Sequence, residues 1–83
     1  MKKPSNEIIR NDRVKMIYSE SILWKEEGIE VFEITPYQFR FIKENHIVDY
    51  YPTSGKYFDI TIQERGFCPT QQIISLFNKN NYF

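Results

Sequence analysis

The chain has 83 residues and a formal net charge of zero, from 11 basic and 11 acidic side chains. This balance argues against a nonspecific nucleic-acid binder, which usually carries an excess of positive charge. Aromatic residues make up 17% of the sequence, and their large buried area lets residues 1–83 form a single small domain without disulfides or metal ions. We expect the ends, 1–7 and 79–83, to fray.

Cysteine usage and the distribution of apolar residues indicate a cytoplasmic protein. Cys68 is the only cysteine, so neither an internal disulfide nor a cysteine-based zinc cluster can form within the chain. The first basic residues are not followed by an apolar run of signal-peptide length. No stretch approaches the ~20 apolar residues of a membrane span. We therefore expect no membrane association, and no residue pattern predicts a cofactor.

Residues 8–28 predict an N-terminal helix. Apolar residues recur there at helical spacing, and Gly28 suits the left-handed residue that often ends a helix. Asn11-Asp12 can act as an internal N-cap, so one long helix, a helix that starts after this pair, and a helix from Ser19 all fit the pattern. A short strand before Ser19 is a further alternative, because residues 14–18 also alternate.

Period-two patterns predict an antiparallel sheet of three or four strands. The expected strands cover residues 29–35, 37–42, 47–51 and 56–62. In the second of them, Tyr37, Phe39 and Phe41 share one face, which we expect to form the core. Gln38 and Arg40 would then point to the opposite face of the sheet.

Short connections and a second helix complete the predicted fold. Glu44-Asn45 forms one turn, and Pro52 to Gly55 has the proline and glycine of a second, tight turn. We expect residues 63–66 to be a loop, and Pro69 to start a C-terminal helix, because proline is favoured in the first helical position.

The predicted fold class is α+β, with an N-terminal helix, the antiparallel sheet and a C-terminal helix in that order. Both helices would cover one face of the sheet and leave the other open. This order is similar to that of double-stranded-RNA-binding domains. The lysine cluster of their second helix is missing here, where the corresponding segment holds only Lys79.

No set of residues has the types and spacing of a catalytic or metal site, so the sequence favours a protein that is not an enzyme. His46 is the only histidine, has no identifiable partner in the sequence, and is expected in an exposed turn. Cys68 precedes the C-terminal helix, where the helix dipole would lower its pKa. A small buried hydrophobic residue is the more frequent role of a lone cysteine, and we expect it here.

Binding residues are predicted mainly around the turn of residues 52–55. Thr53-Ser54-Gly55-Lys56 has the residue types of a phosphate loop, but it leads into a strand, which excludes a Walker A motif. Backbone amides and Lys56 of such a turn can still contact an anion. Tyr50 and Tyr51 alternate, so one is expected in the core and the other at the surface. Arg65 would complete an anion site at the following helix. The candidate binding residues are Arg40, Tyr50, Tyr51, Thr53, Ser54, Lys56 and Arg65.

Residues 49–57 read Asp-Tyr-Tyr-Pro-Thr-Ser-Gly-Lys-Tyr. This segment resembles a motif of small phage and mobile-element proteins, Asp-aromatic-aromatic-Pro-Ser/Thr-Ser/Thr-Gly-Lys/Arg-aromatic. The similarity extends over residues 20–77, with Gly28-Ile29 after the first helix and Glu64 to Phe67 before the last. The resemblance implies a phage or mobile-element setting, in the host cytoplasm, and implies no activity.

Two functions follow as expectations. The first is a small interaction protein that binds a host or phage protein, such as a component of host defence, through the open sheet face and the Tyr50–Lys56 hairpin. The second is a nucleic-acid-binding module, with a fold like that of double-stranded-RNA-binding domains, that uses Arg40, Lys56, Arg65 and the N-terminal basic residues. The open sheet edges also offer a pairing site for a second copy, which would give a homodimer.

Overall fold

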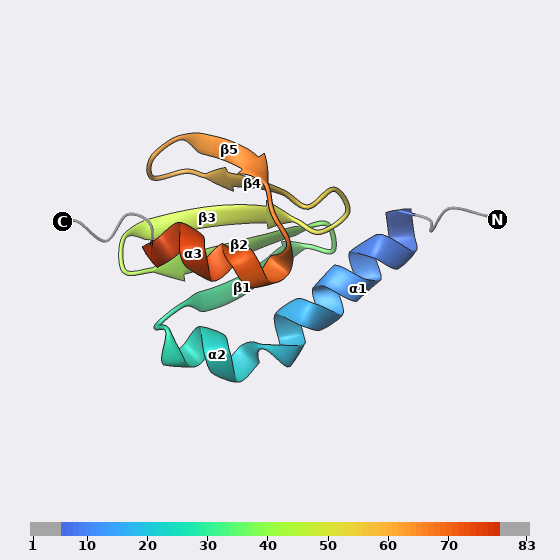
Figure 1. Cartoon of the computed structure of the whole chain (residues 1–83), viewed down its shortest axis with the longest axis horizontal. Helices are drawn as coiled ribbons and strands as arrows, with labels where there is room; N and C mark the ends of the chain where they lie inside the picture. Colours follow the sequence, from blue (N-terminus) through green and yellow to red (C-terminus); the bar gives the residue numbers. More distant parts are fainter. Residues whose placement is uncertain (1–5, 79–83) are drawn as a thin grey trace.

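The computed structural model describes residues 6–78, which form three α-helices and one five-stranded sheet (Figure 1). The helices are α1 (Asn6–Ser19), α2 (Ser21–Glu26) and α3 (Ile73–Asn78), with a 3-10 turn η1 (Thr70–Gln72) before α3. The strands are β1 (Glu30–Thr35), β2 (Gln38–Lys43), β3 (His46–Tyr51), β4 (Lys56–Asp59) and β5 (Glu64–Phe67). The predicted fraying concerns mostly residues outside the described range, although Asn6 and Glu7 belong to α1.

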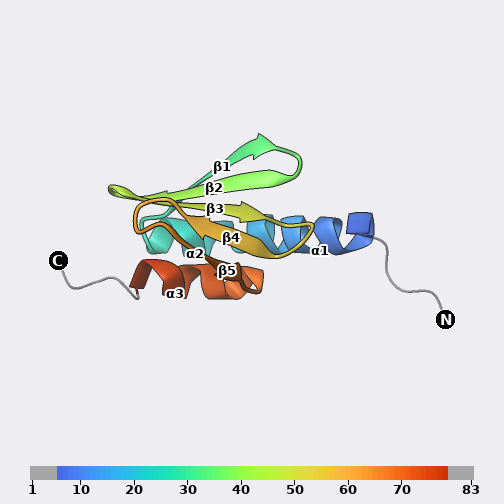
Figure 2. The same ribbon diagram turned by 90° about the horizontal axis from the view of Figure 1, so that it is seen from above.

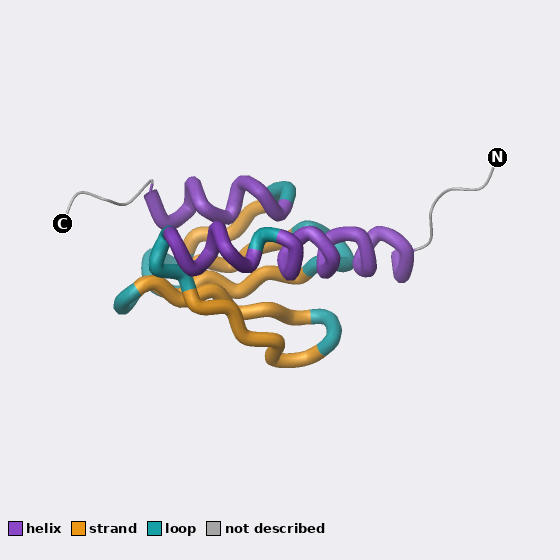
Figure 3. Tube along the Cα trace, turned by 90° about the horizontal axis from the view of Figure 1, so that it is seen from below, coloured by secondary structure: helices purple, strands orange, loops and turns teal. Residues whose placement is uncertain are grey.

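The sheet is an antiparallel meander in the order β1-β2-β3-β4-β5. All three helices lie against one of its faces, and no described element covers the other (Figures 2 and 3). The predicted α+β arrangement is confirmed, with five strands instead of the three or four expected. We call the uncovered side the outer face.

The N-terminal helix is broken at Glu20, which separates α1 from α2. The backbone there leaves the helical region, but the indole nitrogen of Trp24 donates to the carbonyl of Ile17 at 2.8 Å and ties the two pieces together. Neither a helix starting at Ser19 nor a strand before it is present. Gly28 ends α2 as predicted, with a φ of 74°.

The core lies between the helices and the covered face of the sheet. It consists of Ile17, Trp24, Ile29, Phe39, Phe41, Val48, Tyr50, Tyr57, Ile73, Leu76 and Phe77. Phe39 and Phe41 confirm the predicted core face of β2. The prediction for Tyr37 is wrong, because this side chain is 63% exposed in the turn before β2. Its amide donates to the Thr35 hydroxyl, so Tyr37 belongs to the turn instead of the strand.

The segment after β4 differs from the prediction. The strand expected over residues 56–62 ends at Asp59, and the loop expected over 63–66 is mostly the strand β5. The amide of Ile62 donates to Asp59 at 3.3 Å, and Gln63 has a φ of 55°, so the chain reverses there. In β5, a Cβ at Gly66 would lie 2.8 Å from the Tyr57 ring, which therefore packs directly on the backbone.

Within residues 6–78, no helix combines the length and the apolar character needed to cross a lipid bilayer.

Candidate functional site

The outer face carries a mixed row of aromatic and charged residues across all five strands. Each member pairs in register with the next one, so their side chains emerge on the same side of the sheet. This central row is Phe32, Arg40, Asp49, Phe58 and Arg65. The neighbouring row includes Tyr51, Lys56 and Phe67.

An ion pair fixes the middle of the central row. Arg40 donates to the Asp49 carboxylate through Nε at 2.8 Å and Nη2 at 3.1 Å, and Gln38 adds a third bond at 3.0 Å. These contacts enclose Asp49, which is only 4% exposed although no helix covers it. Hydrogen bonding and charge attraction from Asp49 raise the pKa of Arg40 above its ordinary value. Arg40 therefore neutralises Asp49 and holds β2 to β3.

A depression of about 400 Å³ lies beside this pair, lined by Tyr51, Ser54, Lys56, Phe58 and Arg65. We call it the cationic depression, because two of these side chains are positively charged and none carries a carboxylate. The Arg65 guanidinium lies 4.9 Å from the centre of the Phe58 ring. Four of the seven predicted binding residues meet here. Phe58 was missed, although its alternation with Lys56 places both on one face.

Tyr50 and Thr53 do not contribute to this surface. Tyr50 is fully buried on the covered face, and its hydroxyl donates to the Cys68 carbonyl at 3.0 Å. Burial raises the pKa of Tyr50. The hydroxyl oxygen of Thr53 is also buried. The expectation that Tyr50 and Tyr51 take opposite faces is met, since Tyr51 lines the depression.

Arg13 of α1 holds the turn of residues 52–55 from the helix side. Its Nη1 donates to the carbonyls of Pro52 at 2.7 Å and Thr53 at 3.0 Å. Gly55 takes a φ of 77°, donates to Tyr51 at 2.8 Å, and accepts the Cys68 amide at 2.9 Å. The turn is thus a fixed platform. Sequence reasoning missed Arg13, because it lies 39 positions before Pro52 and no sequence pattern connects the two residues.

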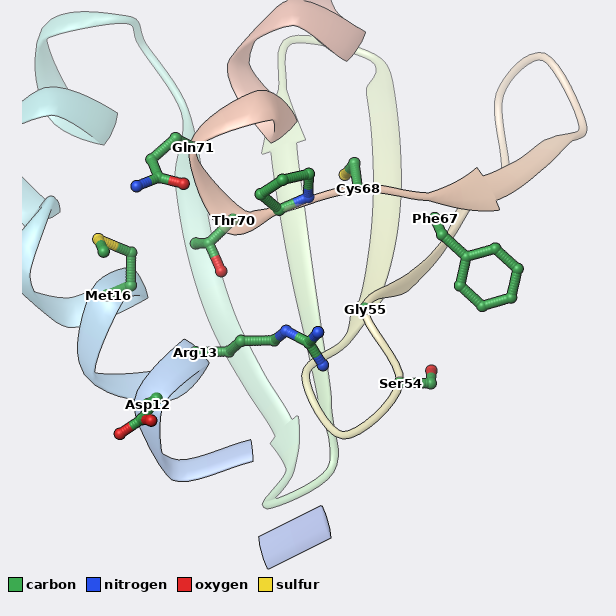
Figure 4. Close-up of a pocket in the computed structure, with 10 residues that line it drawn as sticks. Asp12, Arg13, Met16, Ser54, Gly55, Phe67, Cys68, Thr70 and Gln71 are labelled. Carbon is green, nitrogen blue, oxygen red and sulfur yellow. The ribbon is translucent and has the colours of Figure 1, made fainter. Parts of the chain in front are cut away.

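A second cavity of about 450 Å³ lies on the helix side of the turn, lined by residues that include Arg13, Gly55 and Cys68. In Figure 4, Arg13 reaches from α1 toward the turn, whereas Phe67 points away from the helices. The Arg13 guanidinium already donates hydrogen bonds to the carbonyls of Pro52 and Thr53. Burial raises the pKa of the Cys68 thiol from 9.0 to about 11, so the thiol is protonated at neutral pH. The Cys68 thiol in this cavity is therefore not an activated nucleophile, and the Arg13 guanidinium is bound to the turn.

Cys68 is expected to react slowly with iodoacetamide in the folded protein. At about pH 8 the raised pKa lowers the thiolate fraction roughly 100-fold relative to a thiol of ordinary pKa. Alkylation followed by mass spectrometry should show a rate lower by a similar factor, and full reactivity after unfolding in urea. A folded-state rate above that of the unfolded chain would instead indicate activation by the helix that follows.

His46 is not in an exposed turn, as the sequence suggested, but begins β3 with a side chain only 11% exposed. Its Nε2 lies 2.5 Å from Asp59, which is 1% exposed, and its ring packs against Phe77 at 4.8 Å. The neighbouring Thr61 hydroxyl accepts the Ile47 amide and donates to the Asn45 carbonyl, so it ties the segment after β4 to the start of β3. The His46–Asp59 pair and the contact of His46 with Phe77 join β3, β4 and α3.

Within the described part of the chain, no group of three or more histidine, cysteine, aspartate or glutamate side chains is placed to hold a metal ion. Comparisons of the chain with protein-family models, curated proteins and solved structures found no match.

Proposed function

We propose that this protein is a non-enzymatic interaction protein that binds a protein partner through the outer face and the hairpin of Tyr50–Lys56. The observation that carries the proposal is the one-sided packing of the sheet, which leaves its aromatic and cationic outer face uncovered (Figure 2). Phe67 is 72% exposed there, and Phe32 is also exposed. Aromatic and arginine side chains are enriched at protein interfaces, where they supply much of the binding energy.

The rigidity of this face supports the same function. The Arg40–Asp49 pair fixes the middle of the sheet, and Arg13 fixes the hairpin turn. A partner that docks here would therefore order few additional side chains, which lowers the entropic cost of binding. We include the phage or mobile-element setting and the host cytoplasm in the proposal, on the hairpin motif alone.

Nucleic acid is the second candidate partner. The observation in its favour is the interleaving of Phe58 and Tyr51 with Lys56 and Arg65 on one face, since bases stack on aromatic rings beside cations. The zero net charge weakens this alternative. Fluorescence anisotropy with a labelled single-stranded oligonucleotide at about 50 mM salt tests it, and a steep loss of affinity with added salt would support it.

Site-specific photo-crosslinking tests the proposed function. A photoreactive phenylalanine analogue at position 67 samples the outer face, and the same analogue at position 22 is a matched control. Ile22 lies on α2 and is 71% exposed, against 72% for Phe67. In a nuclease-treated lysate of the cells that carry the gene, we expect one protein to be crosslinked from position 67 and not from position 22. Equal products from both positions, or none from position 67, would overturn the proposal, and a second copy of the chain would identify a homodimer.

A further inference from the structure

We propose that the cationic depression is the subsite for a carboxylate side chain of the partner protein, with a neighbouring apolar side chain of the partner on Phe67. This inference rests on the proposed function and names the chemistry of its ligand. The occupant is an acidic segment in which a glutamate or aspartate and an apolar residue stand two positions apart. Such a segment in extended conformation places every second side chain toward the sheet.

The two cations of the depression are placed to act on one anion. Lys56 pairs in register with Phe67, and Phe58 pairs with Arg65, so Lys56 and Arg65 are diagonal neighbours on adjacent strands. Diagonal neighbours of this kind lie about 7–8 Å apart, within reach of two long side chains that converge on one group. Asp49, the carboxylate beside Phe58 in the central row, is already bound by Arg40. The depression thus keeps a local positive charge in a chain of zero net charge.

The donors suit a planar carboxylate. The Arg65 guanidinium lies over the Phe58 ring, and a guanidinium offers two parallel N–H bonds to a carboxylate. Ser54 Oγ accepts the Lys56 amide at 3.2 Å, so its hydroxyl hydrogen can donate to a ligand. Phe67 extends the site with an apolar surface along the same row as Lys56.

Phosphate is the less suitable anion here, because many phosphate sites add backbone amides of a turn or a helix N-terminus to side-chain cations, and two amides of this turn are already engaged. The amide of Gly55 donates to the Tyr51 carbonyl, and the amide of Lys56 donates to Ser54. Arg65 emerges from β5 on the outer face, whereas the helical segment that follows lies on the covered side of the sheet, so the structure does not bring Arg65 together with the helix amides as expected from the sequence. Side-chain donors dominate the depression.

Peptide titration followed by NMR tests the subsite. The probe is a capped peptide that repeats glutamate, serine, leucine and serine, so that glutamate and leucine share one face in extended conformation, and its control has glutamine in place of glutamate. We expect saturable shifts at the amides of Ser54 and Lys56 and at the Arg65 side chain, with affinity about tenfold lower for the glutamine peptide. Lys56→Gln and Arg65→Gln should each weaken binding several-fold. Lys15→Gln, the same charge change at an exposed position of α1, should have no effect.

Further measurements distinguish a wrong subsite from a wrong proposed function. Equal affinities for the two peptides would overturn the subsite, as would inorganic phosphate or an oligothymidine that saturates the same signals at lower concentration. Arg65→Lys keeps the charge but loses the planar donor pair, and it should bind more weakly than the unmodified protein. If the Lys56→Gln/Arg65→Gln protein still crosslinks from position 67 with unchanged yield, the subsite is wrong and the proposed function holds. Absence of the crosslink from position 67 in the protein that keeps Lys56 and Arg65 overturns the proposed function itself.

Discussion

Replacement of His46 by leucine is expected to lower the free energy of unfolding by about 3–5 kcal/mol, the usual cost of removing one partner from a buried polar pair. Asp59 is 1% exposed, and its carboxylate contacts His46 Nε2 and the amide of Ile62. Leucine fills part of the space beside Phe77 but offers no hydrogen bond. The carboxylate then stays buried with one weak amide contact, and the cost of its desolvation is no longer offset.

Urea denaturation followed by tryptophan fluorescence measures this loss. His46→Leu/Asp59→Leu should recover most of the stability, because replacing both partners of a buried pair by apolar residues removes the orphaned charge. Asn45→Ala, at an exposed neighbouring position, serves as a control and should change stability by less than about 0.5 kcal/mol. A loss below about 1 kcal/mol in His46→Leu would mean that the pair does not hold β3, β4 and α3 together.

The parts of the fold that depend on local chemistry could be predicted from the sequence. Gly28 ends a helix because glycine adopts a positive φ without strain, and the same freedom places Gly55 in the hairpin turn. Alternation identified Phe39 and Phe41 as core. Alternation failed after β4. Ile60 and Ile62 continue the pattern, but the chain turns there, and the Asp59 carboxylate accepts the amide of Ile62.

Contacts between distant residues could not be predicted in this way. Arg13 reaches Pro52, and His46 reaches Asp59, only because the folded sheet and helices bring them together. No spacing rule connects such positions. Arg40 was expected to bind a partner like the other candidate residues, because no pattern in the sequence indicates its ion pair with Asp49.

The candidate site was predicted in part. Tyr51, Ser54, Lys56 and Arg65 do converge, because the turn and the strand alternation place the first three on the outer face. Arg65 joins them for a reason that the sequence did not reveal, namely that β5 pairs with β4. The aromatic partners of these cations were missed, since phenylalanine in a strand is usually assigned to the core.

The Arg40–Asp49 pair leads to the second large effect. Arg40→Met should lower the free energy of unfolding by about 2–3 kcal/mol, less than for a fully buried pair because solvent reaches part of the arginine. Methionine keeps the aliphatic packing over the sheet but leaves the enclosed Asp49 carboxylate with Gln38 alone. Arg40→Met/Asp49→Leu should be closer in stability to the unmodified protein than the single variant. Lys56→Met, which removes a cation from the same face without breaking an ion pair, is the matched control and should cost less than about 0.5 kcal/mol.

The pH dependence distinguishes this pair from an incidental surface contact. The pKa of Arg40 is raised in the folded protein, chiefly by its hydrogen bond to Asp49. A raised folded-state pKa stabilises the protein below the unfolded-state value, and that stabilisation is lost only as the pH rises through the folded-state value. For an arginine this window lies in strong alkali, so the penalty of Arg40→Met should be the same at about pH 6 and about pH 9. Denaturation curves at both values check this, and a penalty that disappears at the higher pH would show that another titrating group maintains the outer face.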